Sequence, residues 1–374
     1  MSNLTLTPSN RIPLLRDPPP PGPEPQIPVS HSHTHPSHSH SHSHSHTHPS
    51  PLPSPPTSPS HAHSNPKTNA SLYFIGNATT LLTYHSARIL TDPNFLHAGD
   101  HVHLGPGVSA TRTHDPVVNL EDLPGIDCIL LSHYHEDHFD RLVEEKLNRD
   151  VLIVTSEHAA GCLGSEEKGF RRVRGLGFWE GVVLPIQTGE DGKGGGGKRP
   201  AVKVTGMPGK HVPPGPLGVV NELLGAVPPT NGWMVELGYL KETEGGLEGE
   251  RKEEEMETGY RIYISGDTLF VDELKGIPEW LNGEKIDLML VHLGGTTIPG
   301  PKMPLVMVTM DGKQGVKLMQ LVDPEVTVPI HFDDYDVMLS GLDDFKKEVD
   351  AAGLGDRVVY LDRGEEYRFS VRGE

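Results

Sequence analysis

The sequence predicts an α/β fold, and three observations support that prediction. Short apolar runs at 126–131, 151–155 and 286–291 have the length and composition of buried strands. Amphipathic segments such as 141–147 follow them, and alternation of strand and helix is typical of α/β proteins. Polar residues that can carry chemistry repeatedly come directly after the strands, where α/β sheets hold their ligands.

The elements can be placed in order along the chain. Residues 71–75 and 79–84 are expected to pair as a hairpin around Gly76-Asn77. A third strand, 88–93, ends at Asp92, which the following proline should hold in extended geometry. The other predicted strands are 201–205, 233–240, 260–265, 325–330, 358–361 and 366–369, and the other predicted helices are 157–162, 268–274, 310–321 and 342–352.

Residues 1–70 differ from the rest of the chain. Proline, serine and histidine dominate this segment, and eleven of the 23 histidines lie between His31 and His63. Such a composition buries too little apolar surface to offset the entropy of ordering, so a disordered low-complexity tail is expected. The histidines could capture metal for a site downstream, or they could bind metal only loosely, which is the favoured reading.

Residues 71–374 are expected to form one folded domain with two flexible insertions. The insertion at 188–200 is rich in glycine, and the insertion at 241–259 is rich in glutamate. The formal net charge of −19 makes a nucleic-acid partner unexpected. Two cysteines give no disulfide framework, and the chain has neither an 18-residue apolar run nor an apparent secretory signal. A cytoplasmic protein is therefore expected.

The most informative stretch is an H-x-H-x-D-H motif formed by His133, His135, Asp137 and His138, directly after strand 126–131. Residues two apart in an extended loop share one side, so His133, His135 and Asp137 should point together. Imidazole nitrogen and carboxylate oxygen suit Zn²⁺, Fe or Mn. The motif therefore predicts a metal site, and the alternative is a polar loop whose histidines only form hydrogen bonds.

This motif resembles the signature of the metallo-β-lactamase superfamily, and the resemblance extends over 71–374. It implies a four-layer αββα sandwich with metals at one edge of the sheets. It also implies that His211, Asp267 and His331, each just after a predicted strand, are metal ligands. Asp92 matches the superfamily's aspartate that supports the metal loop from behind.

The resemblance further implies two divalent metal ions, with Zn²⁺ as first choice and Mn²⁺ or Fe open. One ion would be held by His133, His135 and His211 and the other by Asp137, His138 and His331, with Asp267 and a water bridging them. Asp137 would also be catalytic, taking or returning the proton of that water. Three alternatives stay open: Asp267 as a helix N-cap, His211 as a surface residue, and Asp92 as a turn residue. His292 is either on the substrate side or structural.

The activity that this implies is metal-dependent hydrolysis of an ester, lactone or phosphodiester bond in a small molecule. Residues 264–268 and 329–335 resemble the branch that contains ascorbate-6-phosphate lactonase and, more distantly, the phospholipase D that hydrolyses N-acylphosphatidylethanolamine. No amphipathic lipid-binding segment or basic patch is visible in the sequence, which favours a small-molecule substrate. A phospholipase D-like activity and a non-catalytic metal-buffering protein are the alternatives, and the sequence does not determine the oligomeric state.

Overall fold

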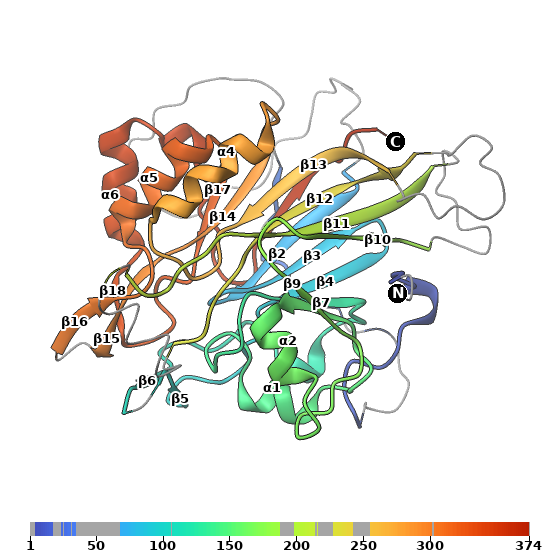
Figure 1. Cartoon of the computed structure of the whole chain (residues 1–374), viewed down its shortest axis with the longest axis horizontal. Coiled ribbons are helices and arrows are strands. Elements are labelled where there is room, and N and C mark those ends of the chain that lie inside the picture. Colours follow the sequence, from blue (N-terminus) through green and yellow to red (C-terminus); the bar gives the residue numbers. More distant parts are fainter. Residues whose placement is uncertain are drawn as a thin grey trace, which may run out of the picture.

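Two β-sheets face each other, and helices cover their outer faces (Figure 1). Helices α1 (Arg141–Lys146) and α2 (Glu157–Leu163) cover one sheet. Helices α4 (Gly276–Leu281), α5 (Gly312–Val322) and α6 (Leu342–Ala352) cover the other. This confirms the predicted four-layer αββα sandwich. The computed structural model describes residues 4–17, 24, 26–30, 32–34, 68–105, 107–187, 198–213, 215, 227–241, 255–300 and 303–373.

The first sheet has the strand order β1-β19-β2-β3-β4-β7-β8-β9. Its strands are β1 (Ser32–Thr34), β2 (Ala70–Gly76), β3 (Thr79–Tyr84), β4 (Ala87–Thr91), β7 (Cys128–Leu131), β8 (Ile153–Ser156), β9 (Val173–Leu176) and β19 (Glu366–Phe369). Strands β2 and β3 form the predicted hairpin, whereas β4, β7, β8 and β9 run parallel. Parallel pairing brings the carboxyl ends of β4 and β7 to the same edge.

The second sheet has the order β10-β11-β12-β13-β14-β17. Its strands are β10 (Gly181–Pro185), β11 (Arg199–Met207), β12 (Gly232–Leu240), β13 (Met256–Ile264), β14 (Leu288–His292) and β17 (Val326–Ile330). Strands β11, β12 and β13 alternate in direction, and β13, β14 and β17 are parallel. The carboxyl ends of β11, β13, β14 and β17 therefore also meet at one edge.

Smaller elements flank that edge (Figure 1). They are the hairpin of β5 (His101–His103) and β6 (Ser109–Thr111) and the three-stranded sheet of β15 (Gly294–Gly300), β16 (Met303–Met307) and β18 (Met338–Ser340). The short 3₁₀ helices are η1 (Pro8–Asn10), η2 (Leu120–Asp122), η3 (Asp272–Lys275) and η4 (Gly355–Arg357). None of these small strands was predicted from the sequence.

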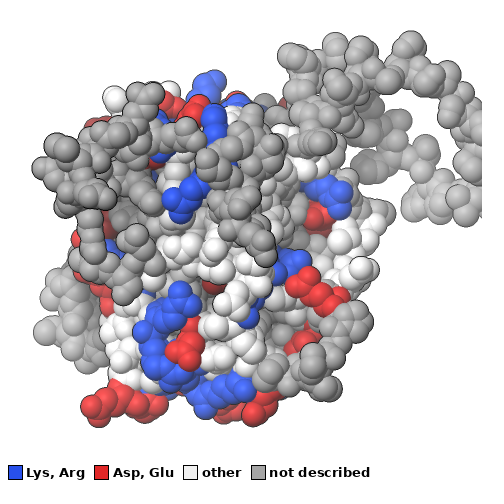
Figure 2. Space-filling view, turned by 90° about the vertical axis from the view of Figure 1, so that its right-hand side faces the viewer, with Lys and Arg blue, Asp and Glu red and all other residues white. Residues whose placement is uncertain are grey.

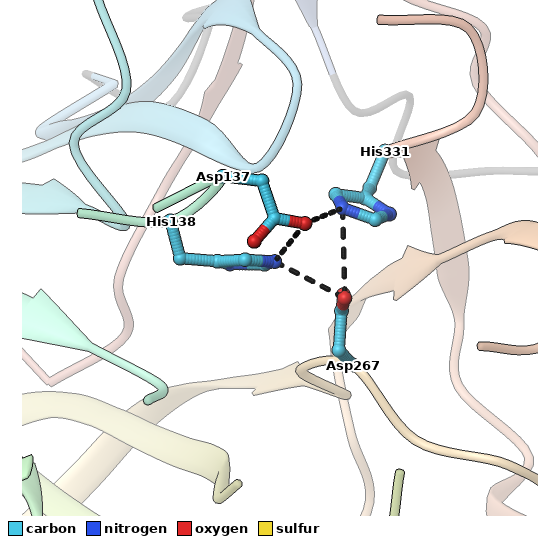
Figure 3. A group of neighbouring side chains, drawn as sticks. All are labelled: Asp137, His138, Asp267 and His331. Atoms are coloured by element: carbon cyan, nitrogen blue, oxygen red, sulfur yellow. Dashed lines mark ion pairs between the residues drawn. The ribbon is translucent and has the colours of Figure 1, made fainter. Parts of the chain in front are cut away.

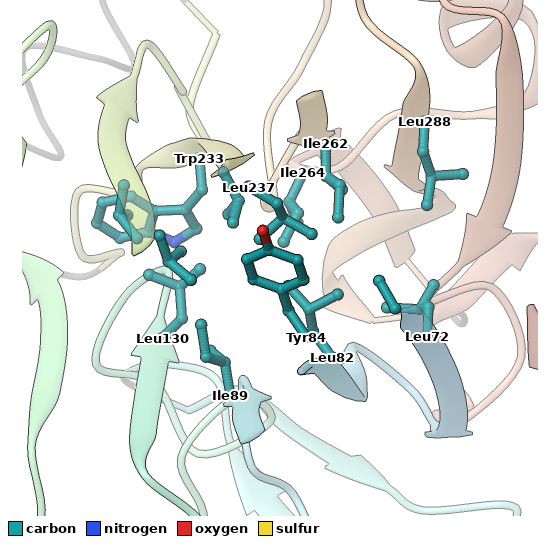
Figure 4. Close-up of a cluster of buried hydrophobic side chains, with 14 of the residues drawn as sticks. Leu72, Leu82, Tyr84, Ile89, Leu130, Trp233, Leu237, Ile262, Ile264 and Leu288 are labelled. Atoms are coloured by element: carbon teal, nitrogen blue, oxygen red, sulfur yellow. The ribbon is translucent and has the colours of Figure 1, made fainter. Parts of the chain in front are cut away.

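A hydrophobic core fills the space between the sheets (Figure 4). It joins Leu72, Leu82, Tyr84, Ile89 and Leu130 of the first sheet to Trp233, Leu237, Ile262, Ile264 and Leu288 of the second. A separate cluster packs α1 and α2 on the first sheet, and another packs α4, α5 and α6 on the second. Because each buried Leu or Ile contributes about 1.5–3 kcal/mol, these layers hold the strand ends at the edge in fixed positions.

Side-chain caps fix where the helices begin. The Asp140 carboxylate accepts a hydrogen bond from the Val143 N–H and starts α1. Ser156 caps α2, and Asp311 accepts from the Gln314 N–H at the start of α5. The cap at Ser156 places α2 immediately after β8, whereas α1 begins only after the loop that follows β7.

Three local predictions were wrong. Residues 268–274 were expected to be helical, but Leu269 N–H donates to the Lys210 carbonyl and Phe270 N–H to the Gln314 side chain, so helix begins only at η3. Asp267 is therefore not a helix N-cap. Residues 358–361 form no strand, although Val358 makes an isolated bridge to Thr327. Asp92 is not extended, because its φ is +32°.

Residues 4–17 differ from the prediction that ordered structure begins near Ser71. Leu6 bridges Ile186 and is buried in the core between the sheets. Leu15 bridges Leu147 next to α1 and is buried as well. The first part of the supposed tail therefore packs on the domain. The histidine-rich residues 35–67 lie outside the described part of the chain.

The two predicted insertions are narrower than expected. Strand β11 begins at Arg199 and β13 begins at Met256, so both strands reach into ranges that were assigned to loops. Residues 188–197 and 242–254 lie outside the described residues. Among the residues that the structure does describe, no helix is long and apolar enough to cross a membrane.

Candidate metal centre

The structure brings all seven residues that the sequence predicted as ligands to one edge of the sandwich. They are His133, His135, Asp137 and His138 after β7, His211 after β11, Asp267 after β13, and His331 after β17. They assemble because parallel strands of both sheets end at this edge. The alternative that His211 is a surface residue is not supported, since its side chain is only 6% exposed.

Asp137, His138 and His331 form what we call the second group, and Asp267 lies against it (Figure 3). The Asp267 Oδ2 atom is 3.1 Å from His138 Nε2 and 3.6 Å from His331 Nε2. The Asp137 Oδ2 atom is 3.8 Å from His138 Nε2 and 3.9 Å from His331 Nε2. Four ligand atoms thus surround a common centre at separations that a cation could span.

His133, His135 and His211 form the first group. The Nε2 atoms of His133 and His211 are 3.2 Å apart, and His211 Nε2 is 3.7 Å from Asp267 Oδ2. Asp267 therefore faces both groups. On the other side, His135 Nδ1 is 2.7 Å from Asp137 Oδ1. The two groups are contiguous, with Asp267 and Asp137 between them.

Backbone geometry at Gly266 aims Asp267 into the centre. Gly266 has φ +61°, and a Cβ atom there would lie 2.4 Å from the Asn231 carbonyl oxygen. Only glycine fits this left-handed turn against a neighbouring backbone. The turn allows β13 to end and Asp267 to point at the histidines at once.

Most of the imidazoles are oriented by a hydrogen bond at Nδ1. These contacts join His133 to Ser132 Oγ at 2.9 Å, His211 to the Val308 carbonyl at 2.9 Å, His331 to the Leu293 carbonyl at 3.2 Å, and His138 to Asp92 Oδ2 at 3.1 Å. Each of these bonds leaves Nε2 directed at the centre. This pattern is characteristic of histidines that ligate a metal through one nitrogen.

Asp92 lies behind the metal loop, as the resemblance implied, and does not act as a simple turn residue. It accepts a hydrogen bond from the Ser132 N–H at 2.6 Å besides its contact with His138. His292 is fully buried, and its Nε2 is 3.8 Å from the Asp92 carboxylate. This placement agrees with a structural histidine and does not support the alternative of a substrate contact.

Electrostatics keep the two carboxylates ionised. Burial alone would raise the pKa of Asp137, but the neighbouring charges of His135 and His138 lower it well below its usual range. Burial likewise opposes ionisation of Asp267, and His331 and His138 outweigh it, so the pKa of Asp267 is also well below normal. Both residues are thus in the anionic form that binds cations.

The imidazoles divide into two classes. Burial and the charges of neighbouring histidines lower the pKa of His133 well below its usual value, and burial lowers the pKa of His211 to about 4. Burial opposes protonation of His138 and His331 too, but the Asp267 carboxylate outweighs it and raises both pKa values. His133 and His211 are therefore neutral, whereas His138 and His331 hold protons that a metal would displace.

The donor atoms fit divalent cations. Several buried polar atoms of the centre contact at most one another and have no hydrogen-bond partner outside it, namely His135 Nδ1 and Nε2, Asp137 Oδ1, His138 Nε2, Asp267 Oδ1 and His331 Nε2. Buried polar atoms are nearly always satisfied, so a cluster of such atoms indicates groups that bind something else. Mixed nitrogen and oxygen donors are the set that Zn²⁺, Fe and Mn accept.

The centre opens to solvent beside the first group. The His135 side chain is 13% exposed and Asp137 7%, whereas His138 is fully buried and His331 is 1% exposed. Four histidines of the neighbouring loop, His97, His101, His103 and His114, are exposed, and among the described residues none of them joins the clusters that could hold a metal.

Sequence reasoning missed one buried residue that touches the centre. Asn77 was interpreted only as part of a hairpin turn, yet its side chain donates to the Asp137 carbonyl at 2.6 Å. The available signal was an asparagine in a turn between two apolar strands. That signal predicts the turn, but it does not predict that the Asn77 side chain contacts the loop that carries Asp137.

Known proteins support the fold and the family resemblance. No family profile matches the chain. A metal-dependent hydrolase of Archaeoglobus fulgidus, named as UPF0173, is 32% identical over 112 residues, which is 30% of this chain and 42% of that protein. A UPF0173 metal-dependent hydrolase of Thermodesulfovibrio yellowstonii is 21% identical over 294 residues, covering 77% of this chain and 91% of that protein. The chain thus matches less than half of the first relative's length but most of the second's.

Solved structures agree in fold. An isothiocyanate hydrolase from Delia radicum gut bacteria superposes with a TM-score of 0.58 at 20% identity, covering 80% of this chain and 99% of that one. A possible metal-dependent hydrolase from Veillonella parvula gives 0.57 at 16% identity, covering 80% and 98%. Together with the αββα layers, these similarities confirm the predicted fold.

Proposed function

We propose that the protein is a dinuclear metal-dependent hydrolase that cleaves an ester, lactone or phosphodiester bond in a small molecule. The observation that supports this best is the convergence of seven donor residues, six of them buried, in two contiguous groups, with Asp267 facing both. Four donors are enough for a single tetrahedral metal, so seven favour a pair. The relatives named as metal-dependent hydrolases point to the same reaction class.

The first group would hold one ion and the second group the other, with Asp267 shared. Two divalent cations at these positions would lower the pKa of a water and polarise the substrate oxygen. Zn²⁺ is the first choice, and Mn²⁺ or Fe suits the same donors. The hydrogen bonds at Nδ1 of His133, His138, His211 and His331 preset the imidazoles for that task.

Asp137 would hold a proton during the reaction. Its Oδ2 faces His138 and His331, whereas its Oδ1 lies 2.7 Å from His135 Nδ1 on the side that contacts solvent. One carboxylate oxygen can thus ligate while the other takes a proton and returns it to the leaving group. No serine or cysteine nucleophile is required.

A small-molecule substrate is favoured over a phospholipid. Figure 2 shows the face on the right-hand side of Figure 1, where basic and acidic side chains are interspersed among the described residues. Anionic lipid headgroups attract clusters of Lys and Arg, and the described part of this face, which lies away from the elements that flank the candidate site in Figure 1, carries no uniform basic surface of that kind. The formal net charge of −19 also opposes binding to an anionic lipid surface.

The test is elemental analysis together with a substrate screen on a shortened protein. Only residues 35–67 should be removed, because Leu6 and Leu15 are buried in the domain. We expect two metal ions per chain after metal-replete purification, and hydrolysis of a lactone, ester or phosphodiester that stops on chelation. One ion or none would contradict the dinuclear proposal. A loss of most bound metal with residues 35–67 would instead favour a buffering protein.

A further inference from the structure

Asn77 connects the loops that carry Asp137 and His331, although these loops follow strands of different sheets. Its side-chain amide donates to the Asp137 carbonyl at 2.6 Å, and its own carbonyl accepts from the His331 N–H at 3.0 Å. Its backbone N–H donates to Asp334 Oδ2 at 2.8 Å. Asn77 is fully buried, so these bonds are shielded from competing water.

The turn that places Asn77 there is conformationally demanding. Asn77 has φ +53°, a left-handed conformation that asparagine tolerates better than other non-glycine residues. His331 is also left-handed, with φ +59°. A histidine in that conformation must be held by its surroundings, and the bond from its N–H to Asn77 is one such restraint.

Asp334 is itself fixed by two arginines. Its Oδ1 is 3.2 Å from Arg112 Nη2, and its Oδ2 is 2.8 Å from Arg363 Nη2. Arg112 is fully buried, and Asp334 is 1% exposed. The Asn77 N–H therefore donates to a buried carboxylate whose charge is balanced on both sides, which makes the anchor of the turn rigid.

We infer that Asn77 is a positioning residue that sets the separation between Asp137 and His331, and thereby the affinity of the second group for its metal. This inference rests on the proposed dinuclear function. Two of the three residues of the first group are held without Asn77, because His133 is oriented by Ser132 and His211 by the Val308 carbonyl. Removing the Asn77 amide should thus weaken one metal and leave the other.

Asn77→Gly is the informative variant. Glycine adopts φ > 0 freely, so the turn and its two backbone hydrogen bonds can persist while only the side-chain amide is lost. Asn282→Gly is the matched control, because Asn282 is an exposed residue with φ +49° at the end of α4. Both variants make the same chemical change in the same backbone conformation.

The measurement is a titration of each protein with Zn²⁺ against a competing chelator, with thermal unfolding of the metal-free proteins alongside. For Asn77→Gly we expect one of the two metals to lose about ten- to hundredfold in affinity and the other to stay within about threefold. Asn282→Gly should bind both ions as the unaltered protein does.

Four outcomes would overturn the inference. If the unaltered protein binds fewer than two ions, the proposed dinuclear function and this inference are both wrong. If the unaltered protein binds two ions, and Asn77→Gly binds both with the same affinities as Asn282→Gly, only the role of Asn77 is overturned. An equal loss at both sites would show a general structural role. If Asn77→Gly does not fold, Asp334→Asn must give the same selective loss, and unchanged affinities in that variant overturn the inference.

Discussion

The first and second groups of the candidate metal centre differ in the hydrogen bonds that orient their side chains. In the first group, His133 and His211 are oriented by a hydroxyl and a backbone carbonyl, both neutral, and His135 borders the opening. In the second group, a buried carboxylate, Asp92, orients His138, and the Asn77 turn connects the backbones of Asp137 and His331. The second group is both more buried and more strongly supported.

The two groups also differ in the protonation of their imidazoles and in their exposure to solvent. In the first group, burial lowers the pKa of His133 and of His211, so both imidazoles are neutral, and the His135 side chain contacts solvent. The second group is enclosed by ionised carboxylates that raise the pKa of its imidazoles, so a metal there competes with protons. A rigid surrounding reduces that cost because the donors need not be reorganised.

The largest effect is expected from Asp267→Asn, because Asp267 is the residue that faces both groups. The substitution keeps the size but removes the charge that lies within 3.1–3.7 Å of three imidazoles. Both metal affinities should fall by more than the roughly hundredfold typical of an outer hydrogen-bond partner. Elemental analysis and chelator titration measure this. Loss of one metal only would mean that Asp267 belongs to a single group.

Asp137→Asn should affect the metal of the second group and leave the metal of the first group bound. We expect the first metal to remain, the second to weaken, and turnover of a substrate found in the screen to fall by at least about a hundredfold, the scale of a lost general base. Asp140→Asn is unsuitable as a control, since Asp140 is buried and accepts from both Val143 and Phe95. Asp343→Asn serves instead, because that side chain is 98% exposed. Similar small losses in both variants would refute the role of Asp137.

Asp92→Asn should weaken only the second group. Asparagine can still accept the Ser132 N–H but no longer presents a negative charge to His138 Nδ1. The expected loss in affinity for the second metal is about ten- to hundredfold. The same titration reads both ions, with the Asp343→Asn protein as reference. A parallel weakening of the first metal would show that the two groups assemble only together.

Leu6→Ala should lower the stability of the fold without changing how the first and second groups differ in metal affinity. Leu6 is 1% exposed in the core between the sheets, so truncation should cost about 2–5 kcal/mol in the free energy of unfolding. Chemical denaturation measures that loss, and the two metal affinities should stay as they are in the unaltered protein. Unchanged stability would show that residues 4–17 do not pack on the domain in solution.

The smallest effect is expected from replacing residues 242–254 by a short Asn-Gly turn. The ends of this segment already meet, since the Lys241 N–H donates to the Glu255 carbonyl at 2.8 Å. A turn of that kind matches the strand twist, and folding and metal content should be retained. A large drop in the thermal midpoint would mean that the segment packs on the domain.

Much of this arrangement follows from local sequence signals. Apolar runs, turn residues and helix caps gave most strands and helices to within a few residues, as for β3 and α6. Because each candidate ligand comes directly after a predicted strand, the resemblance could assign His211, Asp267 and His331 from spacing and order alone. These features depend on residues that are close together in the chain, so they can be predicted from the sequence.

Contacts between distant residues decided the rest. Asn77 and Asp334 are 257 positions apart and meet only because the two sheets face each other. The Leu269 N–H is taken by Lys210 before a helix can form, and Leu6 reaches the core through the edge of β10. Local propensity is a weak term that such hydrogen bonds and burial override. The sequence by itself determined which residues end the strands, whereas only the tertiary structure decided which side chains hold those ends in place.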